Sequence, residues 1–162
     1  TVSINPPNSK MINTENCNLS EYLTENLTKT IKSFNYKQKI VLDLDPDIFM
    51  LIDKTSFPSI ILNLFENAVK YSPAESTITI GLKKLNSKII LSVKDEGNGI
   101  SEEEKNAIFQ KFYRIGSEET RKTKGTGLGL YIVNYIVAQH KGTITVKNNT
   151  PKGSIFEITF NN

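Results

Sequence analysis

Four segments of the sequence alternate apolar and polar residues with a strict period of two. They cover residues 77–83, 88–94, 143–147 and 154–160. Such alternation is typical of strands that bury one face and leave the other in water. The segments come as two neighbouring pairs, joined by a turn at Asn86-Ser87 and by a loop over residues 148–153. We therefore expect a largely antiparallel sheet with one covered face.

A first amphipathic helix is predicted to begin near Ser20, whose side chain is placed to cap the first turn. Its apolar face consists of Leu23, Leu27 and Ile31. Residues 1–18 lack any periodicity, so we expect a linker or flexible arm there, with order beginning at Leu19. A single domain is then expected over residues 19–162.

Two short strands over residues 40–44 and 49–52 are expected to form a hairpin around Asp45-Pro46-Asp47. A second helix follows, from Lys54 or Phe57 to Tyr71, because pairs of adjacent apolar residues recur there with a spacing of four. Its early proline is acceptable only in the first turn of the helix.

Two more helices are expected in the second half of the chain. Ser101 and Glu104 form a capping box, which predicts a short helix over residues 102–110. The last helix covers residues 128–140 and ends before Gly142, where a left-handed cap costs little. The fold class predicted is α+β: a two-layer α/β sandwich whose mixed, mostly antiparallel sheet is covered on one face by about three helices.

Composition excludes several classes of protein. A chain of 162 residues has room for one hydrophobic core, and a net charge of +3 is too small to indicate nucleic-acid binding. No apolar run approaches the roughly 20 residues of a membrane-spanning helix. The single cysteine, Cys17, cannot form an internal disulfide, which fits a reducing compartment.

Polar residues share one face of the otherwise apolar second helix. Asn63, Asn67 and Lys70 are spaced by four and three residues. An amide oxygen suits one coordination position on Mg²⁺, which prefers phosphate oxygens and water at the others. We assign Asn67 to the metal and Lys70 to a phosphate group; a solvated polar stripe is the alternative.

Two glycine-rich segments flank the predicted helices. In residues 95–100, Asp95 ends a strand, and its carboxylate can accept a hydrogen bond from the exocyclic amine of adenine or guanine, although an ordinary turn is the alternative. Residues 125–130 open the last helix, where free backbone amides can bind a phosphate. The second segment is neither a Walker loop nor a dinucleotide-binding fingerprint.

These segments resemble, in order and spacing, the conserved boxes of sensor histidine kinases. Residues 63–73 resemble the N box, 95–100 the first glycine box, 109–114 the F box and 125–130 the second glycine box. The resemblance runs from about Leu19 to Phe160. It implies the Bergerat ATP-binding fold, which gyrase and heat-shock chaperone ATPases share.

The resemblance also implies an activity and its residues. The chain would bind ATP with Mg²⁺ and donate the γ-phosphoryl group to a histidine on a separate dimerisation domain, with a response regulator downstream. Asn67, Lys70 and Arg114 match catalytic residues, Asn67 the metal ligand, Tyr71 the ring near adenine, and Asp95 the acceptor of the adenine amine. The full set of matched nucleotide-binding residues is Asn63, Asn67, Lys70, Tyr71, Asp95, Gly97, Gly99, Ile100, Phe112, Arg114, Gly125, Thr126, Gly127, Leu128, Gly129 and Leu130.

Further expectations follow from this resemblance. Residues 115–124 match a lid over the nucleotide. Asn63 stands where hydrolytic relatives carry a water-activating glutamate, so ATP hydrolysis should be slow. His140, the only histidine, is expected to cap or pack rather than accept phosphate. The fragment is expected to be a cytoplasmic monomer without membrane or nucleic-acid contact, within a membrane-anchored protein.

Two other hypotheses about the function remain open. One is a non-catalytic interaction module with a vestigial pocket, which would show no affinity for nucleotide. The other is a serine kinase of the anti-sigma type with the same fold, which would form an acid-stable phosphate instead of an acid-labile one.

Overall fold

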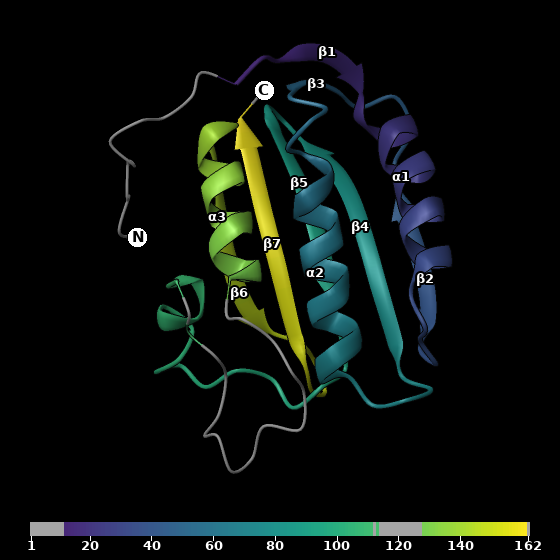
Figure 1. The fold of residues 1–162 in the computed structure, drawn as a ribbon, viewed down its shortest axis with the longest axis vertical. Coiled ribbons are helices and arrows are strands. Elements are labelled where there is room, and N and C mark those ends of the chain that lie inside the picture. The colour runs from purple at the N-terminus through teal and green to yellow at the C-terminus, as the bar shows by residue number, and fades with distance from the viewer. Residues whose placement is uncertain (1–11, 112, 114–127, 162) are drawn as a thin grey trace.

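The computed structural model describes residues 12–111, 113 and 128–161. Within these residues, helices lie against one face of a sheet, as the alternating pattern predicts (Figure 1). In chain order the elements are β1 (Glu15–Asn18), α1 (Leu19–Ser33), β2 (Lys39–Leu44), β3 (Phe49–Ile52), α2 (Pro58–Tyr71), β4 (Thr77–Leu85), β5 (Lys88–Lys94), the 3₁₀ helix η1 (Ala107–Phe109), α3 (Gly129–Gln139), β6 (Gly142–Asn148) and β7 (Ser154–Asn161).

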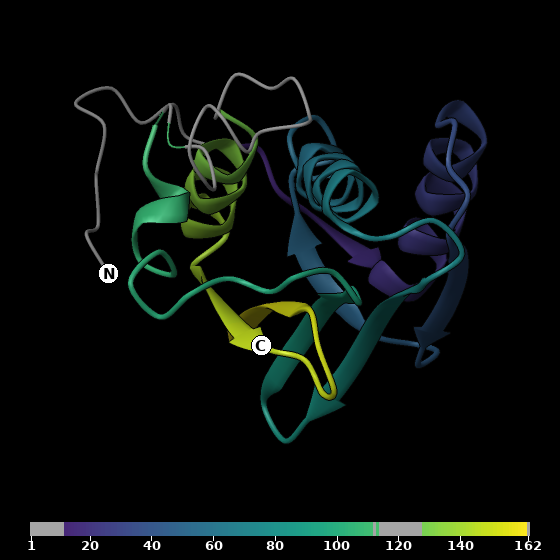
Figure 2. The same cartoon turned by 90° about the horizontal axis from the view of Figure 1, so that it is seen from below.

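The main sheet has the strand order β2-β4-β5-β7-β6. Only β2 and β4 pair in parallel; the other neighbours are antiparallel. Figure 2 shows α1, α2 and α3 on the same side of this sheet. The predicted two-layer α+β sandwich, with a mixed and mostly antiparallel sheet, is therefore confirmed.

The core lies between the sheet and the helices. Each central strand sends alternate residues toward the helices, and on β4 these are Ile78, Ile80 and Leu82, all buried. Removing such side chains from water is the main favourable term in folding. The helices contribute Leu23 and Leu27 from α1, Ile60, Ile61, Leu64 and Phe65 from α2, and Val133, Ile136 and Val137 from α3.

The hairpin predicted between residues 40–44 and 49–52 is wrong. β2 pairs with β4 in parallel, in a register that aligns Ile40 with Ile78, while β3 pairs with β1 in a separate two-stranded sheet. Parallel neighbours need a long crossover connection, and β3 with α2 supplies it. The turn residues are present, with Asp47 at φ 57°, but the chain leaves the main sheet after them.

The N-terminal end of the described residues also differs from expectation. Residues 15–18, which we expected to belong to a linker, form β1, and Asn18 caps α1 by accepting a hydrogen bond from the amide of Glu21. The predicted cap, Ser20, is buried and donates its hydroxyl to the carbonyl of Asp45. Its Oγ also accepts from the amide of Ile48, so Ser20 fastens the loop after β2 to α1.

Two predictions about helix ends need correction. The capping box at Ser101 forms, with the Glu104 amide 3.3 Å from the serine Oγ, but the segment continues as turns and a 3₁₀ helix rather than as an α-helix. After α3 the left-handed residue is Lys141, at φ 59°, and not Gly142. Gly142 instead gives room to β7, because a Cβ there would lie 2.7 Å from the Phe160 ring.

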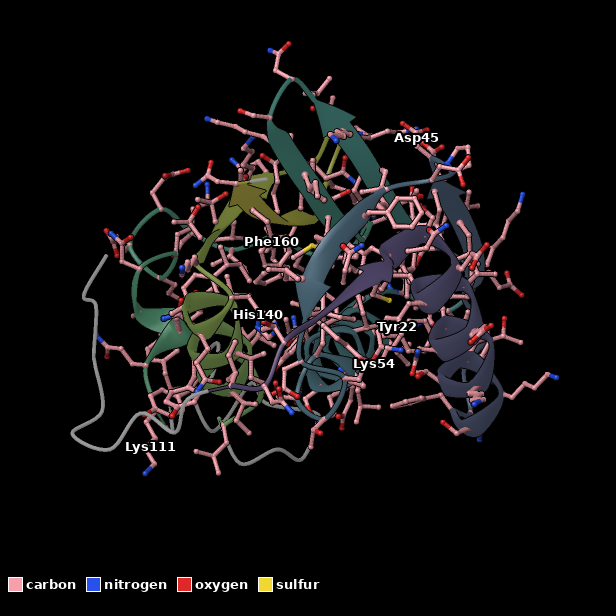
Figure 3. All side chains as sticks on the ribbon, turned by 90° about the horizontal axis from the view of Figure 1, so that it is seen from above. Tyr22, Asp45, Lys54, Lys111, His140 and Phe160 are labelled. Atoms are coloured by element: carbon pink, nitrogen blue, oxygen red, sulfur yellow. The ribbon has the colours of Figure 1, made fainter. Side chains whose placement is uncertain are left out.

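His140 joins the C-terminal end of α3 to the segment that precedes α2 (Figure 3). Its Nε2 accepts a hydrogen bond from the amide of Asp53 at 3.0 Å, and its Nδ1 lies 2.8 Å from the carbonyl oxygen of Ile136. An amide can only donate, so the proton of this imidazole is on Nδ1. The ring also packs edge-on against Phe57 and is buried, which confirms the predicted structural role.

Candidate functional site

The candidate site lies at the end of the helix layer opposite His140. α2 and α3 run in opposite directions, so the C-terminal end of α2 and the N-terminal end of α3 point the same way (Figure 1). β5 ends and β7 begins at this end of the sheet, which brings the residues after Lys94 and the loop 149–153 close to the end of α2.

The carboxylate of Asp95 is buried here, with an exposed fraction of 4%. Its Oδ1 accepts hydrogen bonds from two backbone amides, that of Gly97 at 2.9 Å and that of Ser154 at 3.2 Å. Within the described residues, no hydrogen bond reaches Oδ2. One oxygen therefore fixes the carboxylate, and the other keeps its capacity to accept a hydrogen bond from a ligand.

The backbone of Asp95 is held as firmly as its side chain. Its amide donates to the carbonyl of Ser154 at 2.9 Å, and its carbonyl accepts from Nδ2 of Asn149 at 2.8 Å. Gly153, at φ +105°, packs so tightly that a Cβ would lie 2.0 Å from the same carbonyl oxygen. Only glycine fits a position with both this backbone conformation and this contact.

Burial raises the pKa of Asp95 above its ordinary value, and the amides of Gly97 and Ser154 oppose that rise. Both effects have clear origins: loss of water disfavours the charged form, while donated hydrogen bonds favour it. A buried carboxylate with a shifted pKa and an unfilled acceptor position is typical of a binding site.

α2 contacts this segment through its last residue. A Cβ on Gly97 would lie 2.3 Å from the carbonyl oxygen of Tyr71, so the predicted glycine permits close approach of the two backbones. Tyr71 itself keeps 37% of its surface exposed. Gln38 fixes the end of the helix by donating from Nε2 to the carbonyls of Val69 at 3.1 Å and Ser72 at 3.0 Å.

The middle of α2 faces the start of α3. A Cβ on Gly129 would lie 3.0 Å from Oδ1 of Asn63, while Nδ2 of Asn63 donates to the carbonyl of Ser59. Asn67 and Lys70 follow Asn63 by one and two turns, so α2 extends beyond the N-terminus of α3. Amides at that N-terminus have no partner within the helix, which favours an anion beside this part of α2.

Lys70 is one of two charges on this face of α2. Its ammonium lies 3.3 Å from the carboxylate of Glu66 in an i,i+4 pair, and both side chains are partly exposed. Exposed pairs of this kind contribute little stability.

The remaining predicted residues divide into two groups. Ile100 and Leu130 pack against the core, Gly99 is at φ +77° with its Cα facing Gly153, and Leu128 precedes α3. The predicted ligands Phe112, Arg114, Gly125, Thr126 and Gly127, and the predicted lid over residues 115–124, lie outside the described residues.

Sequence reasoning missed the residues that hold Asp95 from behind. Asn149, Gly153 and Ser154 were assigned to an ordinary loop and strand, although all three contact Asp95. An isolated glycine directly before a strand is the one signal in the sequence for such a close approach. The partners of Gln38 could not be found from the sequence, because they lie more than thirty residues away along the chain.

Comparison with known proteins identifies the class. Residues 52–162 match the family described as histidine kinase-, DNA gyrase B-, and HSP90-like ATPase, and the chain belongs to this family. The sensor protein CiaH of Streptococcus pneumoniae is 41% identical over 109 residues, which are 67% of this chain and 24% of that protein. The sensor protein SrrB of Staphylococcus aureus is 36% identical over 126 residues, or 78% of this chain and 20% of that protein.

Solved structures give the same class. The catalytic domain of histidine kinase ThkA superposes with a TM-score of 0.80 at 26% identity, covering 93% of this chain and 96% of that one. The chain thus matches a catalytic domain over nearly its whole length, whereas it spans about a quarter of the length of CiaH.

Proposed function

We propose that this chain is the ATP-binding catalytic domain of a two-component sensor histidine kinase. It binds ATP with Mg²⁺ and donates the γ-phosphoryl group to a histidine on a dimerisation domain of the same protein, and a response regulator acts downstream. One observation carries the proposal: a buried carboxylate is fixed through one oxygen and open at the other, beside the end of α2. Family membership and the likeness to sensor kinases support it.

Each proposed ligand acts on a different part of the nucleotide. Oδ2 of Asp95 accepts the hydrogen bond of the adenine amine, and the half-exposed ring of Tyr71 lies over the base. Asn67 would supply one oxygen ligand to Mg²⁺, which would neutralise charge on the phosphate groups when bound. Lys70, Arg114 and the N-terminal amides of α3 bind phosphate groups.

The chemistry of this site is positioning and charge neutralisation. Phosphoryl transfer needs little covalent help from the protein once the donor and nucleophile are aligned. The nucleophile comes from outside the chain, because both ring nitrogens of His140 are already engaged and the ring is buried. Asn63 carries no carboxylate that could activate water, so hydrolysis is slow relative to transfer.

In this proposal residues 19–162 form the catalytic domain, and β1 is joined to it by pairing with β3. The domain is monomeric, works in the cytoplasm and touches neither membrane nor nucleic acid. No helix in the described part of the chain has the length and apolar character needed to cross a membrane.

Calorimetric titration with Mg²⁺ and a non-hydrolysable ATP analogue tests the site. Asp95→Asn and Asn67→Ala should each weaken binding, whereas Asp43→Asn, an exposed aspartate on β2, should not. Equal affinity in all four proteins would contradict the assignment. Absence of binding by the wild-type chain would instead favour an interaction module with a vestigial pocket.

A transfer assay separates the two kinase classes. With a histidine-containing dimerisation domain as acceptor, the phosphate formed should be lost in acid and retained in base. An acid-stable phosphate would favour a serine kinase with the same fold.

A further inference from the structure

The loop between β6 and β7 holds Asp95 through a single side chain. Every other hydrogen bond to Asp95 comes from a backbone group, of Gly97 or of Ser154, within the part of the chain that the structure describes. Asn149 alone uses a side chain, with Nδ2 2.8 Å from the Asp95 carbonyl oxygen. It is therefore the contact to Asp95 that a substitution can remove without altering the backbone.

Asn149 is itself fixed in place. Its Oδ1 accepts a hydrogen bond from the backbone amide of Thr150 at 2.9 Å. The backbone amide of Asn149 donates to the carbonyl of Gly153 at 2.9 Å. Both ends of the carboxamide group are thus engaged, one by the loop and one by Asp95. A side chain locked at both ends transmits the position of the loop to the peptide group that it contacts.

The Asp95 carbonyl belongs to the peptide that leads through residue 96 to Gly97, and the Gly97 amide donates to Oδ1, so a rotation of this peptide displaces a donor that orients the carboxylate and its Oδ2. A hydrogen bond weakens steeply when its angle is poor, and a displacement of about 1 Å is enough to weaken a positioned contact strongly. The contact between Asn149 and Asp95 therefore controls how well Oδ2 is aimed at a ligand.

We infer that Asn149 is a positioning residue that sets the selectivity of the site for purines carrying a 6-amino group. The inference rests on the proposed function, because it requires Asp95 to accept the amine of ATP. Asn149 touches no nucleotide in this scheme; it acts through Asp95. Its loss should weaken recognition of the amine while leaving contacts to sugar and phosphates in place.

The test compares two nucleotides that differ only in the amine. Binding of ATP and of purine riboside triphosphate, which has hydrogen at position 6, is measured with Mg²⁺ for the wild type, Asn149→Ala and Asn149→Asp. The wild type should prefer ATP. Both variants should lose about tenfold in ATP affinity, since this is the scale of one hydrogen bond, and less than about twofold for the analogue.

Asn149→Asp is the isosteric variant, because a carboxylate keeps the size of the side chain but cannot donate to the Asp95 carbonyl. Asn148→Ala is the matched control: it removes the neighbouring asparagine side chain, which is exposed, and should leave both affinities unchanged. Thermal unfolding of each protein verifies that the variants are folded at the assay temperature.

Two outcomes would overturn the inference in distinguishable ways. If the wild type prefers ATP and the Asn149 variants lose affinity for both nucleotides equally, or for neither, Asn149 has no role in selectivity and the proposed function stands. If the wild type binds both nucleotides with the same affinity, the assignment of Asp95 fails, and the role of Asn149 fails with it.

Discussion

His140 and Asp95 are both buried titratable side chains, and they lie at opposite ends of the helix layer. His140 has a partner for each ring nitrogen and an aromatic neighbour in Phe57. Asp95 has two partners on Oδ1 and none, among the described residues, on Oδ2. Both groups are immobilised, but only the carboxylate keeps an unfilled position.

The difference between His140 and Asp95 distinguishes a buried group that stabilises the fold from a buried group that can bind a ligand. A buried polar group whose hydrogen bonds are all made within the protein stabilises the fold, because leaving it unpaired would cost about 1–3 kcal/mol. A buried group with one unfilled hydrogen-bonding position retains part of this free-energy cost in the free protein. A ligand that fills the position removes that part of the cost. Substitution of His140 should therefore change mainly stability, and substitution of Asp95 should change mainly binding.

The largest effect is expected from Gly153→Ala, which should disturb both the stability of the fold and the binding of the ligand beside Asp95. The added Cβ would lie 2.0 Å from the Asp95 carbonyl oxygen at a residue with φ +105°. Strain and displacement together should cost about 4 kcal/mol of unfolding free energy. Urea unfolding measures the loss, with the exposed Lys152→Ala as control, and an unchanged midpoint for Gly153→Ala would contradict the tight packing.

His140→Ala should lower the unfolding free energy by about 3 kcal/mol, because it leaves the Asp53 amide without its acceptor and opens a cavity beside Phe57. The affinity for ATP, measured where the variant is folded, should stay close to that of the wild type. A loss of affinity with little loss of stability would place His140 in the functional machinery and remove the contrast.

Asp95→Asn should change the unfolding free energy at neutral pH by no more than about 1 kcal/mol, because the amide oxygen can keep the hydrogen bonds of Oδ1. The pH dependence has a definite sign. Burial raises the pKa of Asp95 above 3.8 in the folded chain, so the folded state holds the proton more tightly than the unfolded state does. Relative to the variant, wild-type stability is highest below pH 3.8 and falls as the pH rises through the raised pKa. Unfolding at a series of pH values checks this, and the opposite slope would contradict it.

The smallest effect is expected from Lys83→Ala on the exposed side of the sheet. The Lys83 ammonium lies 2.9 Å from Asp43 and 3.0 Å from Asp45, and hydrogen bonds to these two carboxylates raise its pKa. Solvent screens such charges, so neither the unfolding midpoint nor ATP affinity should change measurably. If Lys83→Ala clearly lost stability even at high salt, the contacts of Lys83 with Asp43 and Asp45 would contribute more than a screened interaction between surface charges.

Local patterns were enough to predict the three α-helices, the strands of the main sheet and the two-layer sandwich, but not β1 or the 3₁₀ helix η1. The alternation in β4, β5, β6 and β7 and the apolar pairs of α2 each reflect burial of one face, which is visible over a few residues. Pairing between distant segments was not visible. The parallel partner of β2 and the true cap of α1 depend on which groups meet in space, and Ser20 and Asn18 are both acceptable caps by residue type.

Contacts between distant segments were also not visible from the sequence at the candidate site. Asp95, Gly97 and Gly129 could be singled out because glycine and a carboxylate at element ends carry a recognisable pattern. Asn149 could not, because an asparagine in a loop usually bonds to its own turn, and its second bond to Asp95 spans 54 residues.

The exchange of Asp95 for Asn, assayed with ATP and ITP, tests the central claim most directly. ITP carries a carbonyl at position 6, and an amide can donate to it where a carboxylate can only accept. The wild type should prefer ATP, and Asp95→Asn should shift the ratio of the two affinities toward ITP by about 100-fold, the scale expected when a charged hydrogen bond is replaced by opposed groups. The same ratio in both proteins would show that Oδ2 of Asp95 does not read the base.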